Sequence, residues 1–208
     1  MPQLHEGSPS FAFDAPAPYR YLSEQEREEW AELSEDLCVI DHPEGTQYYV
    51  RALLEVPIHG VEEPFLWGVW VSASETSFHR YLDSYDKPPE DPIFFGWLSN
   101  LIAVYPTQKS RPADVHIQTD GTRPRVRLHR TDDESDALVI DQHEGISVAR
   151  AQQLAEQSMH GVQAQQGYSA CPQSVRSYGF MSKKSCQRHD LWQLFIPVRC
   201  SDQLFQPF

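Results

Sequence analysis

Three titratable side chains, Asp141, His143 and Glu144, stand close together just ahead of Ser147, where a helix is predicted to begin. A histidine beside an orienting carboxylate is the pairing from which proteins build a general base, so the cluster predicts a small hydrolase or transferase. The competing interpretation is a polar strand end with a surface histidine. It is favoured because neither a Gly-x-Ser-x-Gly turn nor a cysteine in an activating setting accompanies the cluster.

A β-hairpin is predicted over residues 113 to 128, because Asp120-Gly121 is typical of a two-residue type I′ turn. Around this turn the numbers of cross-strand partners sum to 241. The apolar and polar residues then separate onto two faces, which supports the register. The apolar pairs are Val115 with Val126 and Ile117 with Pro124, and the polar pairs are Asp114 with Arg127, His116 with Arg125 and Gln118 with Arg123.

The polar face of this hairpin carries Arg123, Arg125 and Arg127, with His116 opposite the middle arginine. A guanidinium group recognises carboxylate or phosphate through two parallel hydrogen bonds. The row therefore predicts a site for an anionic ligand or an acidic partner surface. The alternative is a solvated face whose arginines balance nearby carboxylates.

Four residues near the C-terminus are of zinc-ligand types: Cys171, Cys186, His189 and Cys200. Their spacing lacks a paired Cys-x-x-Cys knuckle, so we expect no metal site there. The glycine patterns of nucleotide-binding loops are missing from the sequence as well, and we expect no cofactor. Cys38 lies in the apolar run Leu-Cys-Val-Ile and is predicted to be a buried thiol.

The net charge of −13 is unevenly distributed. Residues 1–158 hold 28 acidic and 12 basic side chains, whereas residues 159–208 hold 2 acidic and 5 basic ones. An acidic body disfavours nucleic acid and anionic membranes as partners, since both require clustered lysine and arginine. It favours a basic protein partner, whose approach it would steer. The change of sign predicts a boundary near residue 160.

The most apolar run, residues 65 to 73, is apolar or small at both alternating sets of positions, which predicts a central strand covered on both faces. Ser72 and Glu75 fit a capping box for the helix that follows. Its apolar positions recur with helical spacing at Phe78, Tyr81, Leu82 and Tyr85. The residues predicted to be buried are Trp67, Val69, Trp70, Val71, Phe78, Leu82, Val50, Leu54 and Val126.

Capping signals and alternation predict the remaining elements. They are an extended start to residue 18 with Phe11 and Phe13 docked, helices at 23–33 and 148–157, strands at 36–41, 47–58 and 137–141, and a strand-like or buried segment at 93–98 with a close backbone approach at Gly96. We therefore predict an α+β fold with a mainly antiparallel sheet of six or seven strands and three helices. We expect residues 1–160 to form the single main domain and residues 161–208 to form a divergent, flexible tail that is dispensable for folding. The alternative is that the apolar run 191–198 adds an edge strand or covers part of the core.

Several segments, taken in their order along the chain, resemble the bacterial family called domain of unknown function 2199. They are HEGSPSFAFDAP (5–16), the pair Glu26-Arg27, LSEDLCVID (33–41), YYVRALLEVPI (48–58), EPFLWGVWVSASETSFHRYL (63–82), FGWLSN (95–100), YPT (105–107), GTRP (121–124) and DQHEGIS (141–147). The resemblance covers residues 5 to 157 and implies a compact bacterial domain, without an activity to transfer.

Two features depart from that family's pattern. Members often carry a Cys-x-x-Cys-Gly pair ahead of the segment matching His5, whereas this sequence has no cysteine before Cys38. Where the family tends to read His-Pro-Leu before its final helix, this chain has Asp136-Ala137-Leu138. Roles that depend on those cysteines or that histidine do not carry over.

Taken together, these patterns predict a non-enzymatic, cytoplasmic binding or interaction domain with an acidic surface. The alternative is the small hydrolase or transferase built on Asp141, His143 and Glu144. No window approaches the ~20 apolar residues that a membrane helix needs, and Met1 to Arg20 lacks a basic start followed by an apolar core. We therefore expect neither a membrane span nor a signal peptide.

Overall fold

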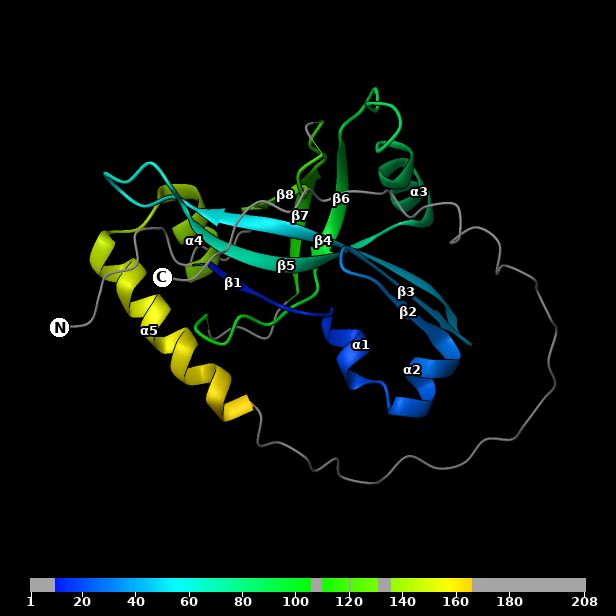
Figure 1. The fold of residues 1–208 in the computed structure, drawn as a ribbon. Coiled ribbons are helices and arrows are strands. Elements are labelled where there is room, and N and C mark those ends of the chain that lie inside the picture. The colour runs from blue at the N-terminus through cyan, green and yellow to red at the C-terminus, as the bar shows by residue number, and fades with distance from the viewer. Residues whose placement is uncertain (1–9, 106–109, 120, 131–135, 166–208) are drawn as a thin grey trace, which may run out of the picture. The chain divides into compact units, whose positions relative to one another are not determined.

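The computed structural model describes residues 10–105, 110–119, 121–130 and 136–165, with side chains as far as residue 159 (Figure 1). All of them belong to the first of two units, Met1–Tyr168; the second, Ser169–Phe208, lies outside the described residues. The last described helix, α5 (Val148–Gln165), continues past the boundary predicted near residue 160. The dispensable tail remains a prediction.

Five strands close into a small barrel: β4 (Gly45–Val56), β5 (Phe65–Ala73), β6 (Ile93–Leu98), β7 (Arg111–His116) and β8 (Arg125–Leu128). Each pairs antiparallel with the next, and β8 returns to pair with β4. Because direction alternates along the series, the first and fifth strands run the same way. The closing pair is therefore parallel, with Leu53 opposite Arg125 and Leu54 opposite Val126.

Three further strands extend the sheet beyond the barrel. On one side, β3 (Leu37–His42) and then β2 (Ala31–Leu33) add antiparallel to the first half of β4. On the other, β1 (Ser10–Ala12) pairs parallel with β5. The described sheet thus has eight strands, and the predicted α+β class with mainly antiparallel pairing is confirmed. The prediction of six or seven strands was low because β1 and β2, at three residues each, are too short to show alternation.

The described part of the chain has five helices rather than the predicted three: α1 (Ala17–Tyr21), α2 (Glu24–Trp30), α3 (Glu75–Asp83), α4 (Ala137–Glu144) and α5. The predicted capping box at Ser23 and Glu26 is present, but α2 ends at Trp30 because β2 begins at Ala31. The cap of α3 is Ser74 rather than Ser72. The helix predicted at 148–157 begins as expected and runs on to Gln165.

The strand predicted at residues 137–141 was wrong. These residues form the first part of α4, because the Asp136 side chain accepts hydrogen bonds from the backbone N–H groups of Leu138 and Val139. Such a cap satisfies donors that the first helical turn leaves free. Leu138 and Val139 then pack into the core from a helix, not from a strand.

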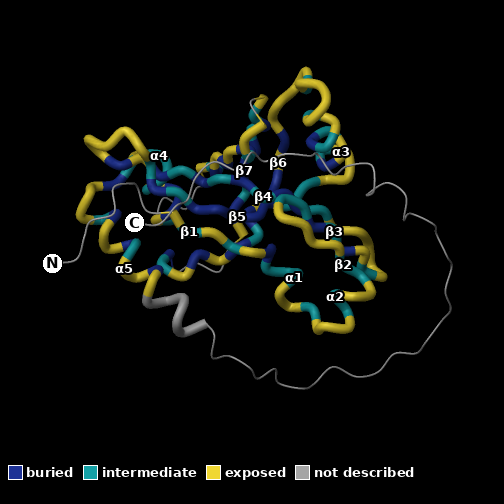
Figure 2. The backbone as a smooth tube through the Cα atoms, viewed as in Figure 1, coloured by how far each residue is buried: buried dark blue, intermediate teal, exposed yellow. Residues whose placement is uncertain are grey.

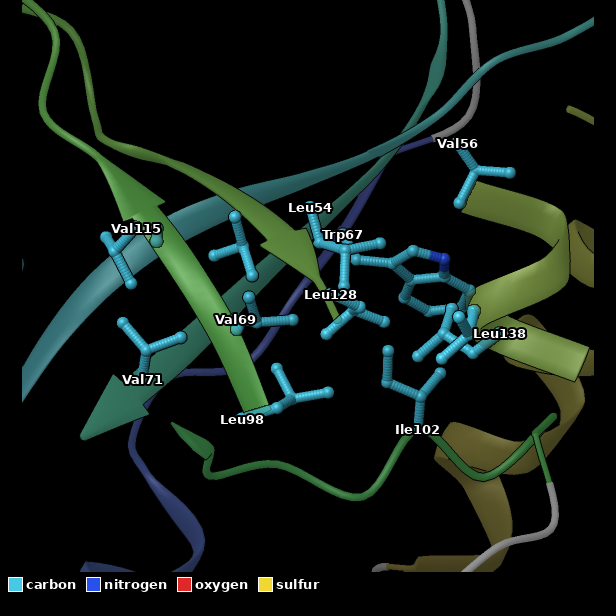
Figure 3. Close-up of a cluster of buried hydrophobic side chains, with 14 of the residues drawn as sticks. Leu54, Val56, Trp67, Val69, Val71, Leu98, Ile102, Val115, Leu128 and Leu138 are labelled. Carbon is cyan, nitrogen blue, oxygen red and sulfur yellow. The ribbon is translucent and has the colours of Figure 1, made fainter. Parts of the chain in front are cut away.

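The core fills the barrel and the space between the barrel and the helices (Figure 3). Buried residues are concentrated along β4 and β5, as Figure 2 shows. Both faces of β5 are covered, as predicted: Trp67, Val69 and Val71 join the main cluster, whereas Trp70 joins a second cluster with Cys38, Ile40 and Tyr49. Of the predicted core residues, only Leu82 is partly rather than largely buried.

Two local predictions about β1 and β6 are confirmed. Phe11 docks on β5, stacking on Phe65 with ring centroids 5.8 Å apart. At Gly96 the backbone of β6 approaches β5 so closely that a Cβ atom would clash with the carbonyl oxygen of Ser72. The Ser72 hydroxyl does not cap α3 and instead accepts a hydrogen bond from the backbone N–H of Trp97.

The hairpin register is also confirmed. Val115 lies opposite Val126 and both are buried, while Asp114 lies opposite Arg127 and His116 opposite Arg125. The ladder stops there, since β7 ends at His116 and β8 begins at Arg125. The pairs predicted closer to the turn therefore lie beyond the strands, and Asp120 itself is outside the described residues.

Replacing Trp70 by alanine should lower the free energy of unfolding by ~3–5 kcal/mol, because the change empties a fully buried site. It also removes the bond from the indole Nε1 to the Phe13 carbonyl oxygen, 3.0 Å away. Tyr21→Ala is the control; with Tyr21 79% exposed, we expect a change within about 0.5 kcal/mol. Denaturant melts of the full chain measure both. A loss below about 1 kcal/mol for Trp70→Ala would contradict the central position of β5.

Candidate functional site

The first member of the predicted catalytic cluster, Asp141, is committed to a buried tyrosine. Its carboxylate accepts a hydrogen bond from the Tyr105 hydroxyl, with an O–O distance of 2.9 Å. Burial, and then the negative charge of Asp141, raise the pKa of the Tyr105 phenol. The Arg150 side chain lies over the Tyr105 ring, with its Nε 3.7 Å from the Asp141 carboxylate. This arrangement fixes α4 and α5 against the loop that follows β6.

The other two members bind elsewhere. His143 Nε2 donates to the carbonyl oxygen of Leu128 at 2.7 Å, since a carbonyl can only accept. Glu144 takes part through its backbone carbonyl, which accepts from His59 Nε2 at 2.9 Å. The structure therefore does not bring Asp141, His143 and Glu144 together around one reacting position. The small hydrolase or transferase built on them stays a prediction.

Gln142, which lies between Asp141 and His143, was not singled out from the sequence. Its side-chain amide donates from Nε2 to the carbonyl oxygen of Val126 at 2.7 Å and accepts at Oε1 from the N–H of Leu128 at 2.8 Å. An amide that bonds both groups of one strand in this way replaces a neighbouring strand. Gln142 thus continues the hydrogen bonding of β8 beyond its short pairing with β4.

The rest of the 141–147 run also has a structural role. Gly145 adopts a φ of 80° and lies so close to His59 that a Cβ atom would fall 2.8 Å from its Nε2. Ile146 forms an isolated bridge with Ile58, just past the end of β4, and the Ser147 hydroxyl accepts from the Arg150 N–H at the start of α5. The run as a whole attaches α4 and α5 to the barrel.

A buried ion pair next to this attachment was also missed. Arg111 on β7 is 4% exposed and bonds the Asp136 carboxylate through two nitrogens, at 2.7 and 3.2 Å. Asp136 caps α4 with the same carboxylate. A sequence alone gives no signal for this pair, because the partners are 25 residues apart. The residue found at the position of the family's histidine is thus a structural anchor.

The predicted arginine row divides in the structure. Arg123 points away to the start of β3, with its Nε 2.6 Å from Asp36 and its terminal nitrogen 2.7 Å from Glu35. Arg125 pairs with Glu55 at 3.0 Å. Both findings agree with the alternative that the row balances nearby carboxylates. Arg127 is exposed, and no ion pair joins it to a carboxylate in the described part of the chain.

Two strands away from Arg127, β6 carries an exposed apolar row. Ile93, Phe95 and Trp97 on β6 are 39%, 49% and 44% exposed, while the alternating residues Phe94 and Leu98 are buried in the core. Phe95 and Trp97 meet edge to face with ring centroids 5.4 Å apart. The sequence Ile-Phe-Phe-Gly-Trp-Leu is apolar at both alternating sets, so it could not show that one set faces outward.

Strand register places charged and imidazole groups on the same outer surface. On β7, His116 and Asp114 lie opposite Ile93 and Phe95, and the β8 residues opposite them are Arg125 and Arg127. His129 Nε2 lies 2.8 Å from the Asp114 carboxylate, and its ring is 5.7 Å from that of Phe95. We call this surface the aromatic face; it comprises Ile93, Phe95, Trp97, Asp114, His116, Arg125, Arg127 and His129.

The four candidate zinc ligands cannot be placed. Cys171, Cys186, His189 and Cys200 lie outside the described residues. Across the part of the chain that is described, no group of three or more His, Cys, Asp or Glu side chains could hold a metal ion. None of the described helices is long and apolar enough to cross a membrane. Cys38 is fully buried, as predicted, and burial raises the pKa of its thiol to about 12.

Gln142→Ala should lower the free energy of unfolding by about 1–3 kcal/mol, because it leaves the N–H of Leu128 and the carbonyl of Val126 without their side-chain partner. Gln157→Ala is the matched control, since Gln157 is exposed on α5 and should have almost no effect. Thermal and denaturant unfolding of both variants provide the measurement. Equal stability of the two variants would show that the amide does not contribute to barrel closure.

Cys38 should resist alkylation while the protein is folded, because its thiol is buried and almost wholly protonated at pH 8. The other three cysteines are replaced by serine for this test, so that Cys38 is the one thiol present. Mass spectrometry after iodoacetamide treatment should find no modification in buffer and full modification in guanidinium. Rapid labelling in buffer would show that β3 opens readily.

One comparison with known proteins gives a family. A family model described as an uncharacterized protein conserved in bacteria, DUF2199, matches residues 2–146. The match spans all eight described strands and α4, and ends before α5 begins. No curated protein and no solved structure matches the chain. Since the family model covers more than half of the 208 residues, the chain belongs to this bacterial family, as its resemblance in sequence indicated.

Proposed function

We propose that this chain is a non-catalytic binding domain of the bacterial cytoplasm, and that the aromatic face holds a partner protein. The observation that carries the proposal is the row of Ile93, Phe95 and Trp97, exposed side by side on one barrel strand. Single exposed apolar residues are ordinary, whereas a contiguous row rimmed by polar groups is typical of an interaction surface. The free, buried thiol of Cys38 is compatible with a reducing compartment.

The composition of the face supports protein binding in particular. Tryptophan and arginine are enriched among the residues that dominate binding energy at protein interfaces, and Trp97 and Arg127 are both exposed here. Phe95 is held by Trp97 on one side and His129 on the other, so its ring loses little freedom on binding. β6 is also a strand of the closed barrel, which presents the row on a rigid support.

The fate of the predicted catalytic residues supports a non-catalytic role. The Asp141 and His143 side chains bond groups of the fold itself, and Glu144 takes part through its backbone carbonyl. A general base needs a nitrogen or oxygen atom that can reach the substrate proton, and a second group that acts on the same substrate position. The structural use of the Asp141 and His143 side chains favours binding over hydrolysis or transfer.

A second candidate is a basic partner held by what we call the acidic arm, residues 24–47. This segment contains nine acidic residues and one arginine. It includes α2, β2, β3 and the start of β4, and β2 is the outermost strand at that end of the sheet. Such a field accelerates the association of a basic protein and weakens as salt is added. Its own test is a charge reversal of exposed Glu28, Glu29 and Glu32 to lysine.

The two candidates are separated by affinity capture from the source cell with the full chain and three variants. Phe95→Ser with Trp97→Ser should abolish recovery of a stoichiometric partner, since it removes both aromatic side chains of the apolar row. Tyr21→Ser, which changes an exposed aromatic residue on α1, should leave recovery unchanged. The melting temperature of each variant is measured first, to show that the variant is folded. A surface change should move this temperature by only a few degrees.

The outcome assigns the surface. Loss with the double serine variant alone supports the aromatic face. Loss with the charge-reversed arm alone supports the second candidate and overturns the first. A partner that survives every variant, or no partner in any fraction, contradicts the proposed binding function.

A further inference from the structure

We infer that the occupant of the aromatic face is an extended, acidic and apolar segment of a partner protein, with a carboxylate of that segment on Arg127. This inference rests on the proposed function and adds the chemistry of the partner. It commits to an anionic segment, although the protein as a whole carries a net charge of −13. The reason lies in how the charges of this one face are engaged.

Among the residues of the aromatic face there are two arginines and one carboxylate. Its one carboxylate, Asp114, is engaged by His129 at 2.8 Å, and Arg125 is engaged by Glu55 at 3.0 Å. Arg127 is exposed, and within the described residues it has no ion-pair partner. A carboxylate matches an exposed guanidinium of this kind with two parallel hydrogen bonds.

Strand register sets the spacing of the apolar and charged contacts. Arg127 lies opposite Asp114, and Asp114 lies opposite Phe95, so Arg127 and Phe95 are two strands apart. At about 4.8 Å per strand, the guanidinium begins about 10 Å from the apolar row. Along β6, successive members of the row are about 7 Å apart, which is the spacing of alternate residues in an extended chain. A segment lying along β6 can therefore place every second side chain on the row.

Two other occupants fit less well. A nucleic-acid strand needs several cations that track its phosphates, and this face has two arginines, one of which is shared with Glu55. A second copy of this chain would bring Arg127 near Arg127 and two net charges of −13 together. An acidic segment meets Arg127 with one carboxylate and covers the rings with its apolar residues. The charges thus favour the acidic segment.

The test uses fluorescence anisotropy with the full chain and three labelled probes. The first is an 11-residue peptide that alternates glutamate with leucine, phenylalanine or tryptophan; the second has lysine in place of every glutamate; the third is a 12-nucleotide oligothymidine. The protein variants are Phe95→Ser, Arg127→Gln and Arg127→Glu. Arg20→Glu is the matched control, because Arg20 is exposed on α1 and the change alters the net charge equally.

We expect the glutamate peptide to bind at least tenfold more tightly than the lysine peptide. Phe95→Ser should abolish binding of both peptides, Arg127→Gln should remove the preference, and Arg127→Glu should reverse it. Arg20→Glu should leave the preference within about twofold, since a distant exposed charge is screened by salt. This pattern supports the inference.

The contrary outcomes separate the two proposals. Equal binding of both peptides that is still lost in Phe95→Ser overturns the acidic segment and leaves the aromatic face as a binding surface. Tighter binding of the lysine peptide, or of oligothymidine, overturns the acidic segment as well. No saturable binding by any probe, or binding that Phe95→Ser leaves unchanged, counts against the inference and against the use of this face.

Discussion

The antiparallel pairing of β4 with β5 is the interaction on which the rest of the structure depends. It joins nine residues of each strand, from Tyr48 opposite Ala73 to Val56 opposite Phe65. Both strands also use their outer edges, β4 for β3 and β8, and β5 for β1 and β6. Because every strand attaches to this pair directly or through one neighbour, burial of its side chains on both faces fixes the whole sheet.

Closure of the barrel explains why residues with catalytic chemistry have structural roles here. Five alternating strands can close only through a parallel pair, and here that pair covers two residues of each strand. The remaining backbone groups of β8 therefore need other partners. Gln142 and His143 supply them from α4, and Asp136 anchors the same helix through Arg111. Gln142 and His143, which lie next to acidic residues in the sequence, thus take part in closing the barrel.

The sequence predicted those parts of the fold that depend on local patterns. Alternation identified β5 and the hairpin register, because each residue's face follows from its position along the strand. Residues 137–141 were misread because a short apolar run looks alike in a strand and in a buried helix, and the cap at Asp136 decides between them. The contacts of the candidate site residues were less predictable. Arg123 binds Asp36, 87 residues away, which no local pattern shows.

The two sides of β6 contribute differently to the barrel. The inward residues of β6, Phe94 and Leu98, fill the barrel without help from the outward ones. Ile93, Phe95 and Trp97 each bury more than half of their surface, which stabilises the barrel, but the part that stays in water adds nothing to stability. That exposed apolar area also makes aggregation easier. Barrel stability therefore does not account for the exposed part of the apolar row, and this is the reason for proposing that the row binds a partner.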